Sequence, residues 1–145
     1  MKLKILTSAA AVALLTAFTP FSVAEKDIVG TWKVDAASVA STVKRVIDKA
    51  VEANPAAEDQ INEQKDKIVE MVQGIRLVMK ADHTYESVTP QGTKPGKWVL
   101  ANKDRVIVFT KEDGTIRRDS ILESTASRMK LINGQLKDTI TYIHP

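Results

Sequence analysis

The chain contains no cysteine among its 145 residues. A disulfide, a thiolate zinc site and a cysteine nucleophile are therefore excluded. An export signal in this chain also cannot end in a lipidated cysteine. Stability has to come from a hydrophobic core, and the chain is long enough to bury one.

Histidines and aromatic residues are also scarce. The two histidines, His83 and His144, do not form a metal site by themselves. His83 lies in a predicted turn, where histidine tolerates left-handed backbone, and His144 adjoins the C-terminus, where chains fray. The aromatic residues (5%) do not form the basic–aromatic platform of single-stranded nucleic-acid binders.

Known catalytic patterns are missing as well. No phosphate-binding glycine-rich loop is present. The acidic residues Glu58, Asp59 and Glu63 lie on a helix face that we assign to water, not in a cleft suited to acid–base catalysis. We therefore expect a non-catalytic protein without cofactor, metal or nucleic-acid partner.

Residues 1–24 have the three parts of a secretory signal peptide. Lys2 and Lys4 form a positive start, Ile5–Phe18 is almost wholly apolar, and Ser22-Val23-Ala24 has the small residues of a cleavage site. The apolar stretch is shorter than the about 20 residues that cross a membrane. We expect a bacterial Sec-type signal cleaved after Ala24 and a periplasmic or secreted product without stable membrane insertion.

The mature chain is almost neutral. The full chain has a formal charge of +3, and loss of the two signal-peptide lysines lowers it to +1. So small a charge predicts no general affinity for nucleic acid or for a membrane surface.

Residues 25–145 are predicted to form a single domain with a helical insertion at about 36–74. Apolar residues recur at helical spacing over 37–53. Pro55 then interrupts the pattern and suits the first turn of a second helix over 55–73, whose apolar stripe is thinner. The two segments predict a helical hairpin.

The remainder alternates between polar and apolar residues and is divided by turn residues such as Asp113-Gly114 and Asn133-Gly134. The predicted strands are 28–34, 75–80, 84–89, 97–101, 105–110, 115–122, 127–132 and 137–143. This order predicts an α+β fold, an antiparallel eight-strand meander that forms either a barrel or a strongly curved sheet. Val106–Phe109 is apolar on both faces, and we expect the helical hairpin to cover it.

The first mature strand carries the motif Gly30-Thr31-Trp32 followed by Lys33. This motif, with a helical hairpin and a strand meander behind it, resembles the calycins, which include small bacterial lipocalin-like proteins and fatty-acid-binding proteins. The resemblance implies that Gly30 allows a tight entry into the strand. It also implies that Trp32 plugs the closed end of a barrel against a late-strand arginine, Arg118 or Arg128.

The same resemblance implies a ligand site inside the barrel. Ile116, Arg118, Ser120 and Leu122 share one face of a strand, and Arg118 points inward if that face is the interior. Arg118 would then meet an acidic headgroup, helped by Tyr85 or Tyr142. Alternatively, Arg118 pairs with a structural carboxylate or extends to solvent. The predicted apolar wall of the site comprises Leu77, Met79 and Phe109.

Two functions fit this pattern. The first is an exported lipocalin-like protein that binds a small apolar or amphipathic ligand, such as a lipid, inside the barrel, with the helical hairpin as a lid. The alternative is a cell-envelope protein–protein interaction module with a filled core, no ligand and an exposed apolar patch.

Overall fold

The computed structural model of the chain describes residues 23–145. The predicted signal peptide lies outside these residues, apart from Val23 and Ala24, and its removal stays a prediction. Val23 is 4% exposed and packs against the hydrophobic core. Cleavage after Ala24 would therefore remove one buried side chain from the barrel.

Eight antiparallel strands close into a barrel in simple sequence order, because β1 pairs with both β2 and β8. The prediction of an α+β fold with an eight-strand meander is confirmed, and the sheet is a closed barrel. The strands are β1 (Gly30–Val34), β2 (Arg76–Met79), β3 (Thr84–Thr89), β4 (Gly92–Ala101), β5 (Val106–Lys111), β6 (Ile116–Ser124), β7 (Arg128–Asn133) and β8 (Asp138–Ile143).

β4 begins earlier than the sequence predicts. The predicted strand covers 97–101, but Lys94-Pro95-Gly96 also belongs to β4. Pro95 pairs with Glu86 of β3, while the pairing of β4 with β5 starts only at Gly96. The backbone nitrogen of Pro95 therefore sits on a free edge, where a strand tolerates proline.

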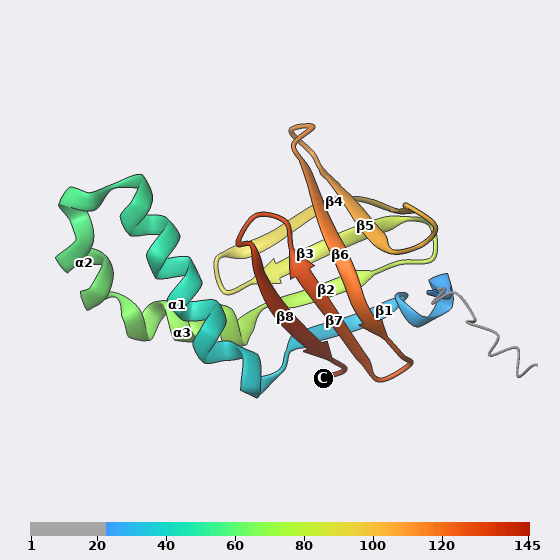
Figure 1. Cartoon of the computed structure of the whole chain (residues 1–145), viewed down its shortest axis with the longest axis horizontal. Coiled ribbons are helices and arrows are strands. Elements are labelled where there is room, and N and C mark those ends of the chain that lie inside the picture. Colours follow the sequence, from blue (N-terminus) through green and yellow to red (C-terminus); the bar gives the residue numbers. More distant parts are fainter. Residues whose placement is uncertain (1–22) are drawn as a thin grey trace, which may run out of the picture.

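The helical insertion follows β1, as predicted (Figure 1). It comprises α1 (Ala36–Ala53), a 3₁₀ turn at Pro55–Ala57, α2 (Glu58–Glu63) and α3 (Lys65–Gly74). Asp35 caps α1, because its carboxylate accepts a hydrogen bond from the Ala37 amide at 3.4 Å. No helix within residues 23–145 has both the length and the apolar character needed to cross a membrane.

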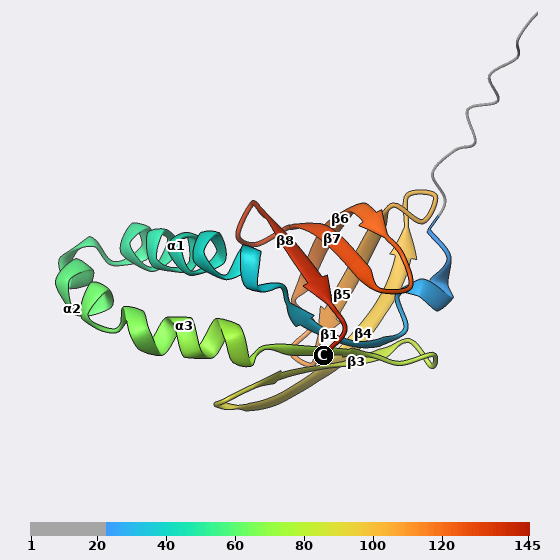
Figure 2. The ribbon, with the colours of Figure 1, turned by 90° about the horizontal axis from the view of Figure 1, so that it is seen from below.

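The helices project from one end of the barrel and do not lie over the middle of the sheet (Figures 1 and 2). α1 packs beside β8, and α3 packs beside β1 and β3. The expectation that they cover Val106–Phe109 is therefore wrong. Ile107 and Phe109 face the barrel core, whereas Val108 faces outward between its cross-strand neighbours Val99 and Arg118. The long stem of an arginine can cover apolar surface, so a helix is not needed there.

Candidate functional site: a cavity at the open end of the barrel

The two ends of the barrel differ. The closed end comprises the 3₁₀ turn Glu25–Asp27 and the turns that follow β2, β4 and β6. The open end comprises the turns that follow β3, β5 and β7, together with the helices.

Trp32 plugs the closed end. Its side chain is fully buried, and its Nε1 donates a hydrogen bond to the Ile28 carbonyl at 2.8 Å. The ring that stacks on it is His144, with 4.1 Å between the ring centroids. The expectation of Arg118 or Arg128 at this position is wrong. Arg118 is exposed on the outer face, and Arg128 is half exposed beside Glu123.

His144 is held in place, so the expectation of a frayed end is also wrong. Its Nδ1 lies 2.7 Å from the Thr31 carbonyl oxygen and its Nε2 lies 2.8 Å from that of Ala126. Gly30 makes room for the ring, because a Cβ at this position would lie 2.9 Å from Cε1 of His144. Gly30 also has a φ of +146°, a conformation that side chains rarely adopt.

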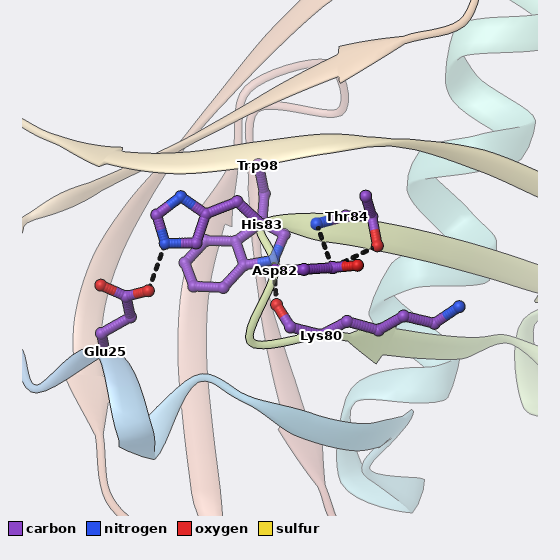
Figure 3. A network of polar contacts seen from close by, with 6 residues as sticks. All are labelled: Glu25, Lys80, Asp82, His83, Thr84 and Trp98. Atoms are coloured by element: carbon purple, nitrogen blue, oxygen red, sulfur yellow. Dashed lines mark hydrogen bonds and ion pairs between the residues drawn. The ribbon is translucent and has the colours of Figure 1, made fainter.

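His83 lies in the turn between β2 and β3 with a φ of +66°, which confirms the predicted turn (Figure 3). Its ring contacts the Glu25 carboxylate and packs against Trp98, with 5.0 Å between the ring centroids. Trp98 donates from Nε1 to the Lys80 carbonyl. In the same turn, hydrogen bonds from the Thr84 hydroxyl and amide lower the pKa of Asp82. These contacts tie the start of the described chain to the closed end.

The open end contains a cavity of about 840 Å³. Strands on all sides of the barrel line it, and residues of α1 and α3 border it. Its inner wall includes Val34, Leu77, Tyr85, Arg117, Ile140 and Tyr142. Of the residues predicted for a ligand site, Leu77, Tyr85 and Tyr142 line this cavity. Met79 and Phe109 are each 1% exposed and belong to the packed core instead.

Arg118 does not point into the barrel. It is exposed and pairs across the sheet with the outward-facing Val108, whereas Arg117 pairs with Phe109 and lines the cavity. The predicted inward face was wrong because Ile116 and Leu122 are exposed, at 57% and 48%. The interior face of β6 carries an ion pair in place of these apolar residues.

That ion pair joins Arg117 and Asp119. Nε of Arg117 donates to Oδ1 of Asp119 at 3.0 Å, and Nη2 lies 3.0 Å from Oδ2. The Gly134 amide also donates to Oδ1, at 2.9 Å. Oδ2 accepts no hydrogen bond of good geometry from a described residue, so the Nη2 contact is an ion pair only. Burial raises the pKa of Asp119, outweighing the opposing effect of Arg117 and of the Gly134 amide.

The guanidinium also stacks on an aromatic ring. The Arg117 Cζ lies 4.4 Å from the centre of Phe109, a cation–π distance. Phe109 in turn meets Tyr85 edge to face, with 5.0 Å between centroids. Phe109 therefore supports two polar groups of the cavity wall without lining the cavity.

Tyr85 and Tyr142 bring hydroxyl groups to the same region from β3 and β8. Burial raises the pKa of Tyr85, and it raises the pKa of Tyr142 to about 12. The charge of Arg117 lowers the pKa of both hydroxyls and the charge of Asp119 raises it. Neither hydroxyl forms a hydrogen bond with a described residue. Both hydroxyls therefore keep their proton at neutral pH and can donate it to a hydrogen bond.

The mouth of the cavity carries charged side chains that are exposed to solvent. Lys94, Lys111, Glu112 and Asp113 are all exposed there, and Lys49 forms an ion pair with Glu52 on α1. Charges exposed to water interact weakly with their neighbours. Within residues 23–145, no three His, Asp or Glu side chains gather in a way that could hold a metal ion.

The patterns in the sequence do not predict the roles of four residues, Arg117, Asp119, Gly134 and His144. A usable signal existed for Arg117. The loop Glu112–Gly114 joins Lys111 to Thr115, and counting back along both strands places Arg117 opposite Phe109. Directly opposed residues share a face, so an inward Phe109 implies an inward Arg117. No comparable local signal predicts the position of His144.

Comparisons with known proteins add little to this geometry. No family model matches the chain, and no curated protein matches it. Among solved structures, the chain is similar to the crystal structure of a DUF4847 family protein from Bacteroides vulgatus ATCC 8482. The identity is 19% and the TM-score 0.47, over 80% of this chain and 92% of that one.

Proposed function

We propose that this protein is an exported, non-catalytic, lipocalin-like carrier that binds a small amphipathic ligand in the open end of the barrel. The cavity of about 840 Å³ is the observation that carries the proposal. Its volume lies in the range typical of small-molecule sites, roughly 300–1,000 Å³. Its wall combines apolar side chains with a few converging polar groups, which is the usual composition of such a site.

The Gly30-Thr31-Trp32 motif supports the calycin-like part of the proposal. The motif opens β1, and Trp32 plugs the barrel end opposite to the cavity. The other candidate, an interaction module with a filled core, finds less support, because the open end leaves a cavity between the helices and the strands.

The proposal is tested by native mass spectrometry of the mature protein and by titration with an uncharged fluorescent apolar probe such as N-phenyl-1-naphthylamine. Ser87 lines the cavity and its neighbour Val88 does not. Ser87→Trp should fill the mouth and abolish probe binding, while the matched control Val88→Trp should bind like the wild type. A wild type that carries no small molecule and takes up no probe would overturn the proposal.

Export is tested separately. We expect the intact mass of the protein from a periplasmic fraction to correspond to a chain that begins at Glu25. A protein that retains residues 1–24 in the cytoplasm would contradict export and leave the ligand proposal standing.

A further inference from the structure

The polar groups of the cavity wall converge from three separate strands. Tyr85 comes from β3, Arg117 from β6 and Tyr142 from β8. The remaining wall combines the apolar residues Val34, Leu77 and Ile140 with polar side chains that include Thr42, Ser87 and Asn133. A ligand that fills the cavity would therefore place one polar end against the cluster of Tyr85, Arg117 and Tyr142 and its apolar body against the apolar residues.

The cation in this cluster is already neutralised by the protein. Two nitrogens of Arg117, Nε and Nη2, face the carboxylate of Asp119 at 3.0 Å. Asp119 is fully buried and is held from a second side by the Gly134 amide. The pair thus belongs to the wall of the barrel. Nη1 makes no hydrogen bond to a described residue, so Arg117 keeps a donor for a ligand without an unbalanced charge.

The two tyrosine hydroxyls, like Nη1 of Arg117, are free to bond to a ligand. Neither Tyr85 nor Tyr142 has a hydrogen-bond partner among the described residues, although both side chains are only 6% exposed. The hydroxyl oxygens are not among the fully buried unpaired atoms, so they are open to the cavity and available to a ligand that fills it. The two hydroxyls offer uncharged donors and acceptors to a ligand. Water screens the charge of the exposed lysines at the mouth, so these lysines attract an anionic ligand only weakly.

An anionic headgroup would fit this cluster poorly. A ligand carboxylate placed against Arg117 would compete with Asp119 for one guanidinium, and two carboxylates sharing a site repel each other. A hydroxyl, ester or amide group has no such conflict and can accept hydrogen bonds from Nη1 and from the tyrosines.

We propose that the ligand's polar end is uncharged and accepts hydrogen bonds from Arg117, Tyr85 and Tyr142, and that Asp119 enforces this choice by neutralising Arg117. The inference rests on the proposed carrier function. It assigns to Asp119 a positioning and specificity role, since its own carboxylate is not exposed to the cavity.

The test compares ligands that share one alkyl chain and differ in the head. Dodecanol, methyl dodecanoate and dodecanoate are titrated into the lipid-free mature protein by calorimetry at neutral pH, below the micelle concentration of the acid. We expect the alcohol and the ester to bind at least about tenfold more tightly than the acid, since one lost pairing of this kind is worth about that factor. Tighter binding of dodecanoate to the wild type would overturn the inference while leaving the carrier function intact.

Asp119→Asn sharpens the test, because it frees the charge of Arg117 with little change in shape. This variant should shift the preference toward dodecanoate by about tenfold or more. Arg118→Met is the matched control on the outer face and should leave all three affinities unchanged. If Asp119→Asn does not fold, the wild-type order of affinities decides alone. If none of the three ligands binds to the wild type, the carrier function fails and the inference fails with it.

Discussion

The closed end of the barrel buries Trp32 and Trp98 almost completely, whereas the open end turns Tyr85 and Tyr142 toward a cavity. Both tryptophan N–H groups donate to backbone carbonyls within the protein. Neither tyrosine hydroxyl has such a partner among the described residues. Aromatic residues at one end therefore complete the packing, and at the other end they leave polar groups free for a ligand.

The charged pairs at the two ends differ in the same way. Glu25 and His83 at the closed end are both about half exposed, so their attraction is screened by water. Asp119 at the open end is fully buried, and its partner Arg117 is mostly buried. Removal of one partner from a buried pair leaves an uncompensated charge, so the open end is the more sensitive of the two to charge changes.

The largest effect is expected at the closed end. Trp32→Ala should lower the free energy of unfolding by about 3–5 kcal/mol, because it removes a fully buried indole and leaves a hole. Urea denaturation measures the loss. Val99→Ala, at a position 47% exposed on the outer face, should change the stability by no more than about 0.5 kcal/mol. Equal losses in the two variants would show that Trp32 does not belong to a packed core.

A smaller effect should follow from loss of the histidine that stacks on Trp32. His144→Ala removes one stacked ring and two contacts to carbonyl oxygens, and should cost about 1–2 kcal/mol. It should also shift the tryptophan emission to longer wavelength. Pro145→Ala is the control at the adjacent position and should change neither property. An unchanged emission spectrum in His144→Ala would show that the C-terminus does not cover Trp32 in solution.

Tyr142→Phe should have almost no effect on stability and a clear effect on binding. Its hydroxyl has no protein partner to lose, so the free energy of unfolding should stay within about 0.5 kcal/mol of the wild type. The affinity for dodecanol should fall about fivefold, as expected for one lost hydrogen bond. A loss of stability comparable to that of Trp32→Ala would mean that the hydroxyl is a structural group, contrary to the comparison of the two ends.

The smallest effect is a difference in pH dependence. Burial raises the pKa of Asp119 above its ordinary 3.8, so its contribution to stability is present below that value. The contribution is lost as the pH rises through the raised pKa. The stability of the wild type relative to Asp119→Asn should therefore fall as the pH increases from below 3.8 through this window. Urea midpoints over a pH series measure the difference.

Asp113 should affect the pH dependence of stability in the opposite direction to Asp119. A hydrogen bond from Thr115 lowers its pKa below 3.8, so its contribution is present above that value and is lost as the pH falls through the lowered pKa. The stability of the wild type relative to Asp113→Asn should therefore rise with pH. Slopes of the same sign for both variants would contradict the assignment of Asp119 to a buried site.

Most of the strand order could be predicted, because its signals are local. Asp-Gly and Asn-Gly sequences mark hairpin turns, and alternation marks the strands between them. The exceptions have tertiary causes. Pro95 lies within β4 because β5 ends before reaching it, so this stretch is a free edge. Val108 needs no helix over it because its neighbours on the sheet flank it.

The candidate site was predicted only in part. Leu77, Tyr85 and Tyr142 line the cavity, but Arg118 does not. Its face was assigned from the apolar residues Ile116 and Leu122, which are exposed, while Arg117 and Asp119 occupy the interior. A buried ion pair reverses the usual pattern of apolar residues inside and charged residues outside, so alternation alone points to the wrong face of such a strand.

Local patterns in the chain are enough to locate most strands, helices and turns, and the Gly-x-Trp motif that opens the first strand. Those features follow from backbone preferences and periodicity, which act over a few residues. Closure of the sheet, the stacking of His144 on Trp32 and the pairing of Asp119 with Arg117 are visible only in the folded chain. These contacts join residues far apart in the chain or on facing strands, and their energies depend on burial and register, which no short stretch of sequence contains.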